Sequence, residues 1–127
     1  MEHNIIAVLI GVESCLDLPP IDGVQASVAA LRARLSPHVD DVITLHDPTH
    51  RQLHQSAGKL RDRLGPDDVL IWYFAGYTAS LEAADHTTFC ILPHDAMLGH
   101  FRQFVPLVDW LADMAAKHVW VMVDGVQ

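Results

Sequence analysis

The sequence predicts an α/β fold in which an open, mainly parallel sheet carries helices on both faces. Three continuous apolar runs rich in β-branched residues, at 5–12, 69–74 and 119–123, are typical of strands buried on both faces. Segments with apolar residues at helical spacing separate them, so strands and helices alternate along the chain. With 127 residues, the chain suits one compact domain, and we expect a single domain over residues 1–127 without a linker.

The first half of the chain predicts two strand–helix units. After the strand at 5–12, Asp22 is expected to cap a helix that Pro37 ends. A short strand at 42–45 follows, and Gly65 closes the second helix. Both helices should bury one stripe of apolar residues, Val24, Val28, Leu31 and Leu35 in the first and Leu53, Ala57, Leu60 and Leu64 in the second.

The second half holds the strand at 69–74, a helix beginning near Pro106 and the strand at 119–123. The helix should present Leu107, Leu111 and Met114 on one face. Residues 75–104 break the alternation, with a strand expected around 87–92 and loops elsewhere. The three tryptophans are expected to pack inside, at Trp72, Trp110 and Trp120.

Charge and composition exclude several classes of function. Lys and Arg total 8 against 16 acids, a net charge of −8, which repels a phosphate backbone, so a nucleic-acid partner is not expected. No apolar stretch reaches the roughly 20 residues that cross a bilayer, and the N-terminus lacks the pattern of a signal peptide. We therefore expect no membrane association and a cytoplasmic location. The two cysteines lie far apart and predict neither a disulfide framework nor a thiolate metal cluster.

Ligands of open α/β sheets bind beyond the carboxyl ends of the strands, here residues 11–20, 75–85 and 124–127. Gly11 is followed by neither the dinucleotide-binding glycine pattern nor a phosphate-binding loop, so no nucleotide cofactor is expected.

Four segments of the chain, taken in order, carry a resemblance to a known family: AVLIGVESCLDLPPIDG, VITLHDPTHRQLHQSAGKL, DDVLIWYFAGY and HVWVMVDGV. In their order and content they resemble bacterial members of the caspase and metacaspase superfamily of cysteine endopeptidases, in the large-subunit-like portion of their three-layer fold. The resemblance implies that the last two segments are the strands that deliver a catalytic histidine and cysteine. Matched residue by residue, Tyr77 stands at the histidine position, Thr78 at the glycine after it, and Val126 at the cysteine position.

The resemblance therefore implies a homologue that has lost its catalytic dyad. Valine offers no nucleophile, and a phenol with a pKa of about 10 is a poor general base. Asp124 matches an acid that helps family members hold a basic substrate side chain, so Asp124, Gly76 and Thr78 are expected to outline a vestigial substrate cleft. We expect an inactive interaction or regulatory module, in which Tyr77 is either a pocket phenol or a loop residue that replaced histidine.

The family's chain continues beyond the cysteine strand, whereas this sequence stops at Gln127. Either the remainder lies on another polypeptide, or the strand between Val119 and Val123 exposes an edge that pairs with a protein partner or a second copy. The competing prediction is an enzyme, either a cysteine endopeptidase completed by a second chain or a hydrolase that uses Ser80, Thr78 or His86.

Two histidine patterns are open to a chemical interpretation. His46, His50 and His54 recur every four residues, as in zinc-binding helices, but Pro48 interrupts them and no other ligand type joins, which favours a solvated face without metal. Cys90 lies between His86 and His94 at even spacing, so on a strand all three would share a face. A buried structural thiol is the simpler interpretation of Cys90, and also of Cys15.

Overall fold

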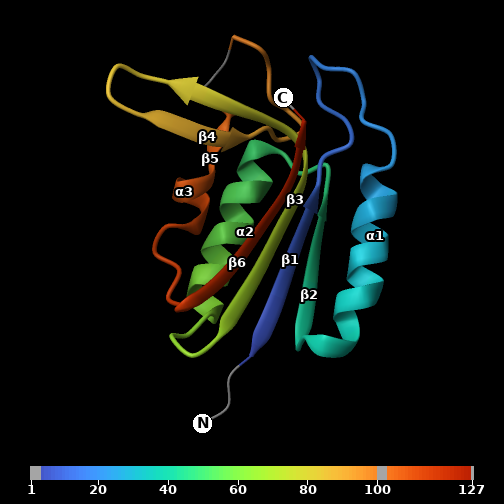
Figure 1. Cartoon of the computed structure of the whole chain (residues 1–127), viewed down its shortest axis with the longest axis vertical. Coiled ribbons are helices and arrows are strands. Elements are labelled where there is room, and N and C mark those ends of the chain that lie inside the picture. The colour runs from blue at the N-terminus through green and yellow to red at the C-terminus, as the bar shows by residue number, and fades with distance from the viewer. Residues whose placement is uncertain (1–3, 100–102, 127) are drawn as a thin grey trace.

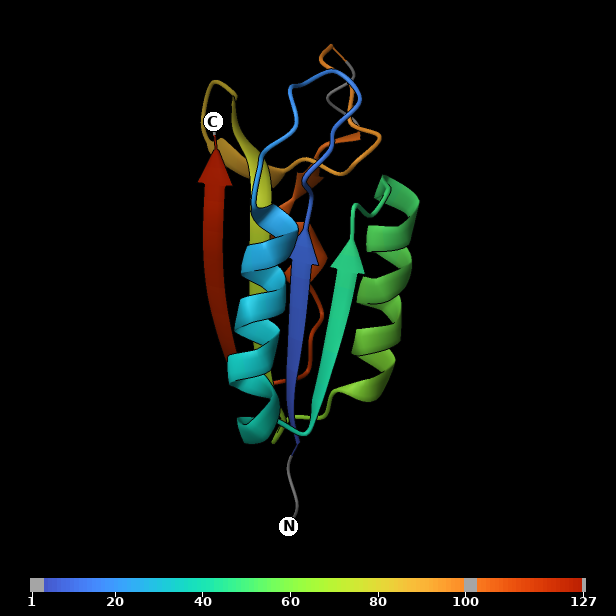
Figure 2. The same cartoon turned by 90° about the vertical axis from the view of Figure 1, so that its right-hand side faces the viewer.

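A computed structural model of the chain describes residues 4–99 and 103–126. Its elements form a mixed sheet with helices packed on both sides (Figures 1 and 2). The strands are β1 (Ile5–Gly11), β2 (Asp41–His46), β3 (Val69–Glu82), β4 (Thr87–Ile91), β5 (Val105–Pro106) and β6 (His118–Val126). The helices are α1 (Val24–Leu35), the 3-10 turn η1 (Ser36–His38), α2 (His50–Arg63) and α3 (Leu107–Leu111).

Four strands run parallel in the order β2-β1-β3-β6, because β1 and β6 pair with overlapping residues of β3 and so occupy its opposite edges. The expectation of a mainly parallel sheet holds for this part only. Beyond it, β3 pairs with β4 and β4 with β5 in antiparallel fashion, which makes the sheet mixed.

Each face of the sheet has its own apolar core. Ala7 and Leu9 of β1 pack against Val28 of α1 on one face. On the other, Val8 and its alternate neighbours in β1 meet α2, α3 and the β4–β5 region in the larger cluster. This alternation explains why the strand at 5–12 is apolar throughout, since burial on both faces leaves no position for a polar side chain.

The ends of α1 and α2 are set by different local chemistry. Thr49 caps α2, as its hydroxyl accepts from the Gln52 N–H while the Gln52 side chain accepts from the Thr49 N–H. The predicted cap of α1 was wrong. Gly23, at φ +86°, stands at the cap without a side-chain hydrogen bond, and Asp22 lies in the turn before it.

The predicted end of the strand at 69–74 was also wrong. Residues from Ala75 to Glu82 do not form a loop but continue β3, whose second half pairs with β4. Tyr77 therefore lies in a strand and not in a loop. The change of neighbours falls at Gly76, where φ is +155° and an added Cβ would lie 3.0 Å from the Val12 carbonyl oxygen, a position that only glycine fits.

Two further expectations need correction. The helix after Pro106 is short, and Met114 lies beyond its last residue, Leu111. Every residue of β6 is exposed, and Trp120 is 67% exposed, because no element covers this strand within the described residues. Trp72 and Trp110 are buried as predicted.

Candidate functional site

The two positions matched to a catalytic dyad lie side by side. Tyr77 and Val126 are direct partners in the parallel β3–β6 register, at the carboxyl end of the sheet. The Tyr77 hydroxyl donates a hydrogen bond of 2.8 Å to the Pro19 carbonyl oxygen, so the ring is fixed against the loop after β1. Val126 is 42% exposed and presents only methyl groups. Tyr77 and Val126 can therefore contact a bound molecule, but neither of them supplies a nucleophile.

Thr78 and Gly125 have complementary sizes. Thr78 is buried, and its side chain fills the space over Gly125, where an added Cβ would lie 2.7 Å from Cγ2 and 2.9 Å from Oγ1 of Thr78. Thr78, which the resemblance matches to a glycine, is thus accommodated because Gly125 on the neighbouring strand has no side chain. The importance of Gly125 could not be inferred from the sequence, since it depends on strand pairing.

A small hollow of about 160 Å³ adjoins these strand tips, lined by Asp124, Gly76 and Val126 together with the start of α1. Asp22 and Asp124 both line it, so the hollow is acidic. It therefore contains Asp124 and Gly76 of the expected vestigial cleft, while Thr78 lies next to Gly125. The volume is below the roughly 300 Å³ at which ligand pockets usually begin, so it suits at most one side-chain tip.

Tyr73 lies close to Asp124, at the edge of this acidic hollow, which we call the acidic corner. Nothing in the sequence around Tyr73 indicated a functional residue. Its register partner on β6 is Met122, and its side chain forms a hydrogen bond with Asp124, two residues further along that strand. Burial, the negative charge of Asp124 and the hydrogen bond with that carboxylate all raise the pKa of the Tyr73 phenol. The phenol therefore stays protonated and acts as a hydrogen-bond donor, not as a base.

Neither cysteine is a poised nucleophile. Burial, followed by the charges of Asp47 and Asp95, raises the pKa of Cys15 to about 11. Burial and then the charge of Asp109 raise the pKa of Cys90, whose side chain lies in the larger core. Since the thiolate is the reactive form of cysteine, the burial and raised pKa of both thiols suit packing and not nucleophilic attack.

The suggested Cys90 cluster is not formed. His86 lies in the turn between β3 and β4, beside Asp85, and His94 lies beyond the end of β4. The His94 ring instead contacts the Ser14 carbonyl oxygen, and the Leu16 N–H donates to the His94 carbonyl. Pro93 follows Leu92 immediately after the strand, so the even spacing of a strand does not extend to His94.

The loop after β1 is held by Asp47, which has a left-handed backbone at φ +46°. Its carboxylate accepts from the Glu13 and Ser14 N–H groups at 2.7 and 3.2 Å, and its own N–H donates to the Gly11 carbonyl. The Cys15 thiol donates to the Pro93 carbonyl at 3.5 Å. These bonds position the loop whose Pro19 carbonyl receives the Tyr77 hydroxyl.

His50 and His54 approach closely on α2, with 3.2 Å between their Nε2 atoms. Burial and the nearby His54 lower the pKa of His50, while Asp95 opposes the shift. His46 lies instead beside Asp47, at 3.4 Å. Within residues 4–99 and 103–126, no three His, Cys, Asp or Glu side chains are grouped to hold a metal ion.

Ser80, Thr78 and His86, the residues considered for a rebuilt hydrolase site, occupy different surroundings. Ser80 is paired with Phe89 in the β3–β4 ladder, Thr78 is buried over Gly125, and His86 sits in the connecting turn. None of the hydrogen bonds found among the described residues links one of these three to another, so the structure gives no support to a Ser–His or Thr–His pair.

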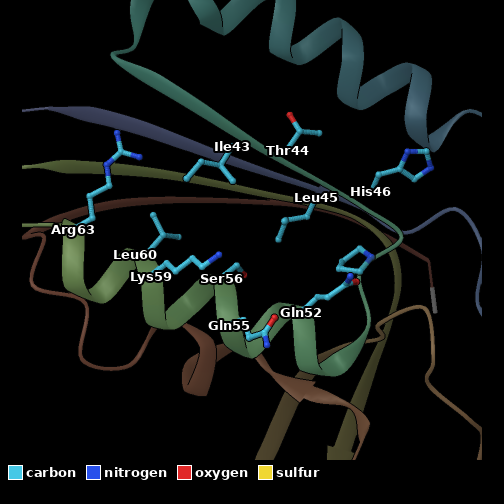
Figure 3. A pocket seen from close by; sticks show the side chains of 11 residues that line it. Ile43, Thr44, Leu45, His46, Gln52, Gln55, Ser56, Lys59, Leu60 and Arg63 are labelled. Carbon is cyan, nitrogen blue, oxygen red and sulfur yellow. The ribbon is translucent and has the colours of Figure 1, made fainter.

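A larger groove, which the sequence patterns did not indicate, lies between β2 and α2 (Figure 3). Its volume is about 460 Å³. Leu45 and Leu60 give it apolar walls, and Lys59 and Arg63 lie along α2 at its margin. Arg63 is held by Asp41 at 2.7 Å, and this hydrogen bond lowers the pKa of that carboxyl. The groove lies at the β2 edge of the parallel strands, opposite the edge that β6 forms.

A comparison with models of known protein families finds no matching family, and a comparison with curated proteins finds no matching relative. Among the residues that the structure describes, no helix is both long enough and apolar enough to cross a membrane.

Proposed function

We propose that the protein is a catalytically inactive caspase-like domain that works as an interaction or regulatory module. The observation that carries the proposal is the direct pairing of Tyr77 with Val126, at the two positions that the resemblance assigns to histidine and cysteine. The emptied pair lies at the carboxyl end of parallel strands, where α/β sheets place their sites.

The chemistry of the site supports binding over cleavage. Peptide hydrolysis by this route needs a thiolate and an imidazole that moves a proton near neutral pH. Val126 and the hydrogen-bonded Tyr77 supply neither group. Thr78 also fills space over Gly125 that a glycine at position 78 would leave open. The acidic corner at Asp124 retains the charge to contact one basic side chain, as a remnant of a substrate cleft.

The open edge of β6 is the proposed interaction surface. It presents an apolar strand with exposed side chains on both faces, which monomeric proteins rarely leave uncovered. Two free, buried cysteines suit a reducing compartment, and we place the protein's work in the cytosol, with a protein as its partner.

Electrophilic activity probes distinguish this proposal from an enzyme. The purified protein should show no stoichiometric labelling by an acyloxymethyl ketone, which reacts with catalytic cysteines, or by a fluorophosphonate, which reacts with catalytic serines. Mass spectrometry of the digest identifies any labelled residue. Labelling at one residue that a heat-denatured sample does not show, whether at Ser80, Cys15 or elsewhere, would contradict the proposal and favour a hydrolase.

A further inference from the structure

In the sequence of β6, residues at equal distances on either side of the central residue are chemically suited to pair with each other. The seven residues from His118 to Asp124 read His-Val-Trp-Val-Met-Val-Asp, with Val121 at the centre. Going outward from Val121, the residues at equal distances are first Trp120 and Met122, then the two valines, and then the basic His118 and the acidic Asp124. A strand that pairs with itself in antiparallel fashion brings together residues related in this way.

The position of β6 leaves this sequence available for pairing. Among the described residues, β6 pairs only with β3, and it forms the outer strand of the parallel sheet (Figure 2). Its backbone groups on the far edge therefore have no strand partner there. Trp120 and Met122 are exposed by 67% and 42%, although both are large and apolar.

We infer that β6 binds a second copy of the same chain, antiparallel and centred on Val121, which joins the two sheets into one. The inference rests on the proposed function, in that it names the partner of the proposed interaction surface. A two-fold axis at Val121 makes the interface self-complementary, as in most homodimers.

The side chains support this register over others. His118, Trp120, Met122 and Asp124 alternate with the three valines, so they share the sheet face on which α1 lies. On that face, Trp120 would meet Met122 of the second copy, a favourable sulfur–aromatic contact. On the other face only valines would meet.

Charge supplies the element that selects a second copy over an unrelated strand. Each His118 would lie opposite Asp124 of the other copy, so the interface contains the pair twice. The Asp124 carboxylate can accept a hydrogen bond from the imidazole of His118. When that imidazole is protonated, its positive charge adds an attraction to the carboxylate. Two copies with a net charge of −8 each repel one another, and these pairs offset the repulsion locally.

A charge swap tests the inference in the 127-residue chain by sedimentation equilibrium. The parent protein should dimerise. His118→Asp places acids opposite acids and Asp124→His places imidazoles opposite imidazoles, so each should weaken the dimer about tenfold or more. The double variant His118→Asp/Asp124→His should restore it. All substituted side chains are exposed, and circular dichroism confirms that each variant folds.

Single cysteines test the register. Opposite residues of antiparallel strands lie about 4.5–5.5 Å apart at Cα, within disulfide reach. Val121→Cys should form a disulfide-linked dimer on its own, whereas Val119→Cys and Val123→Cys should do so only when mixed. The parent chain, with its buried cysteines, is the control. A monomer at 100 µM, on the order of the concentrations at which weak dimers form, would overturn the inference, as would no recovery in the double swap or self-linking of Val119→Cys.

These results separate the two proposals. A monomeric protein that no electrophilic probe labels would contradict the pairing of β6 and leave the loss of catalysis intact. A dimer that a probe labels at a single residue would contradict the loss of catalysis and leave the pairing intact.

Discussion

Replacing Trp110 with alanine is expected to lower the free energy of unfolding by about 3–5 kcal/mol, since this is the cost of emptying a buried tryptophan site. Trp110 is 2% exposed and joins α3 to α2, because its Nε1 donates a hydrogen bond of 3.0 Å to the Leu53 carbonyl. Its ring also lies 5.7 Å from that of Trp72, centroid to centroid. The variant should unfold at a clearly lower urea concentration.

Phenylalanine at the two tryptophan positions separates packing from hydrogen bonding. Both rings are buried, but the Trp72 Nε1 has no hydrogen-bond partner among the residues that the structure describes, while that of Trp110 has one. Trp72→Phe removes an unsatisfied buried donor, whereas Trp110→Phe loses a bond. Trp72→Phe should therefore cost less, by about 1 kcal/mol or more. Equal losses in urea unfolding, or a larger loss for Trp72→Phe, would contradict the assignment of these bonds.

Gly125→Ala is expected to lower the free energy of unfolding by about 1–3 kcal/mol, because the new methyl group enters space that Thr78 fills. Both near atoms belong to a β-branched side chain in a buried strand, which has little freedom to turn away. The double variant Thr78→Ala/Gly125→Ala should recover most of the loss, since the two closest atoms are removed and the third, the Thr78 Cβ, lies at 3.4 Å.

Gly58→Ala is the matched control for Gly125→Ala. Gly58 lies in α2 with open space around the added methyl group, so alanine should stabilise the helix by about 0.5–1 kcal/mol. Thermal or urea unfolding of the parent, Thr78→Ala, Gly125→Ala and the double variant gives the coupling between positions 78 and 125. Additive losses at the two positions would mean that Thr78 does not fill the space above Gly125, and would contradict the account of this site.

The elements that the sequence predicted well are those fixed by local patterns. The helices α1 and α2 each bury one face, which gives an apolar stripe at helical spacing in the sequence. Strand β1 is buried on both faces and is therefore apolar throughout. The same patterns failed at β3. Gly76 and the polar residues after it resemble a loop, but pairing with β4, a nonlocal contact, keeps them extended.

The candidate site shows the same division. The resemblance located Tyr77 and Val126, and the register then paired them, but the match of Thr78 with Gly125 and the contact of Tyr73 with Asp124 depend on neighbouring strands. The apolar residues of β6 predict a strand without indicating whether anything covers it. Trp120 is exposed for that reason, and the groove beside α2 likewise arises only from tertiary packing.

Under the proposed function, the protein lacks a catalytic histidine and cysteine and does not cleave peptides. Measuring peptide cleavage by the purified protein is the most direct test of this proposal. Fluorogenic peptides with Arg, Lys or Asp before the scissile bond, incubated with reductant, should release no fluorophore above the rate of a buffer blank. Cys15→Ser and Cys90→Ser variants should give the same null rate. Cleavage that a thiol reagent abolishes, and that one of these substitutions removes, would contradict the claim that the protein has no catalytic nucleophile.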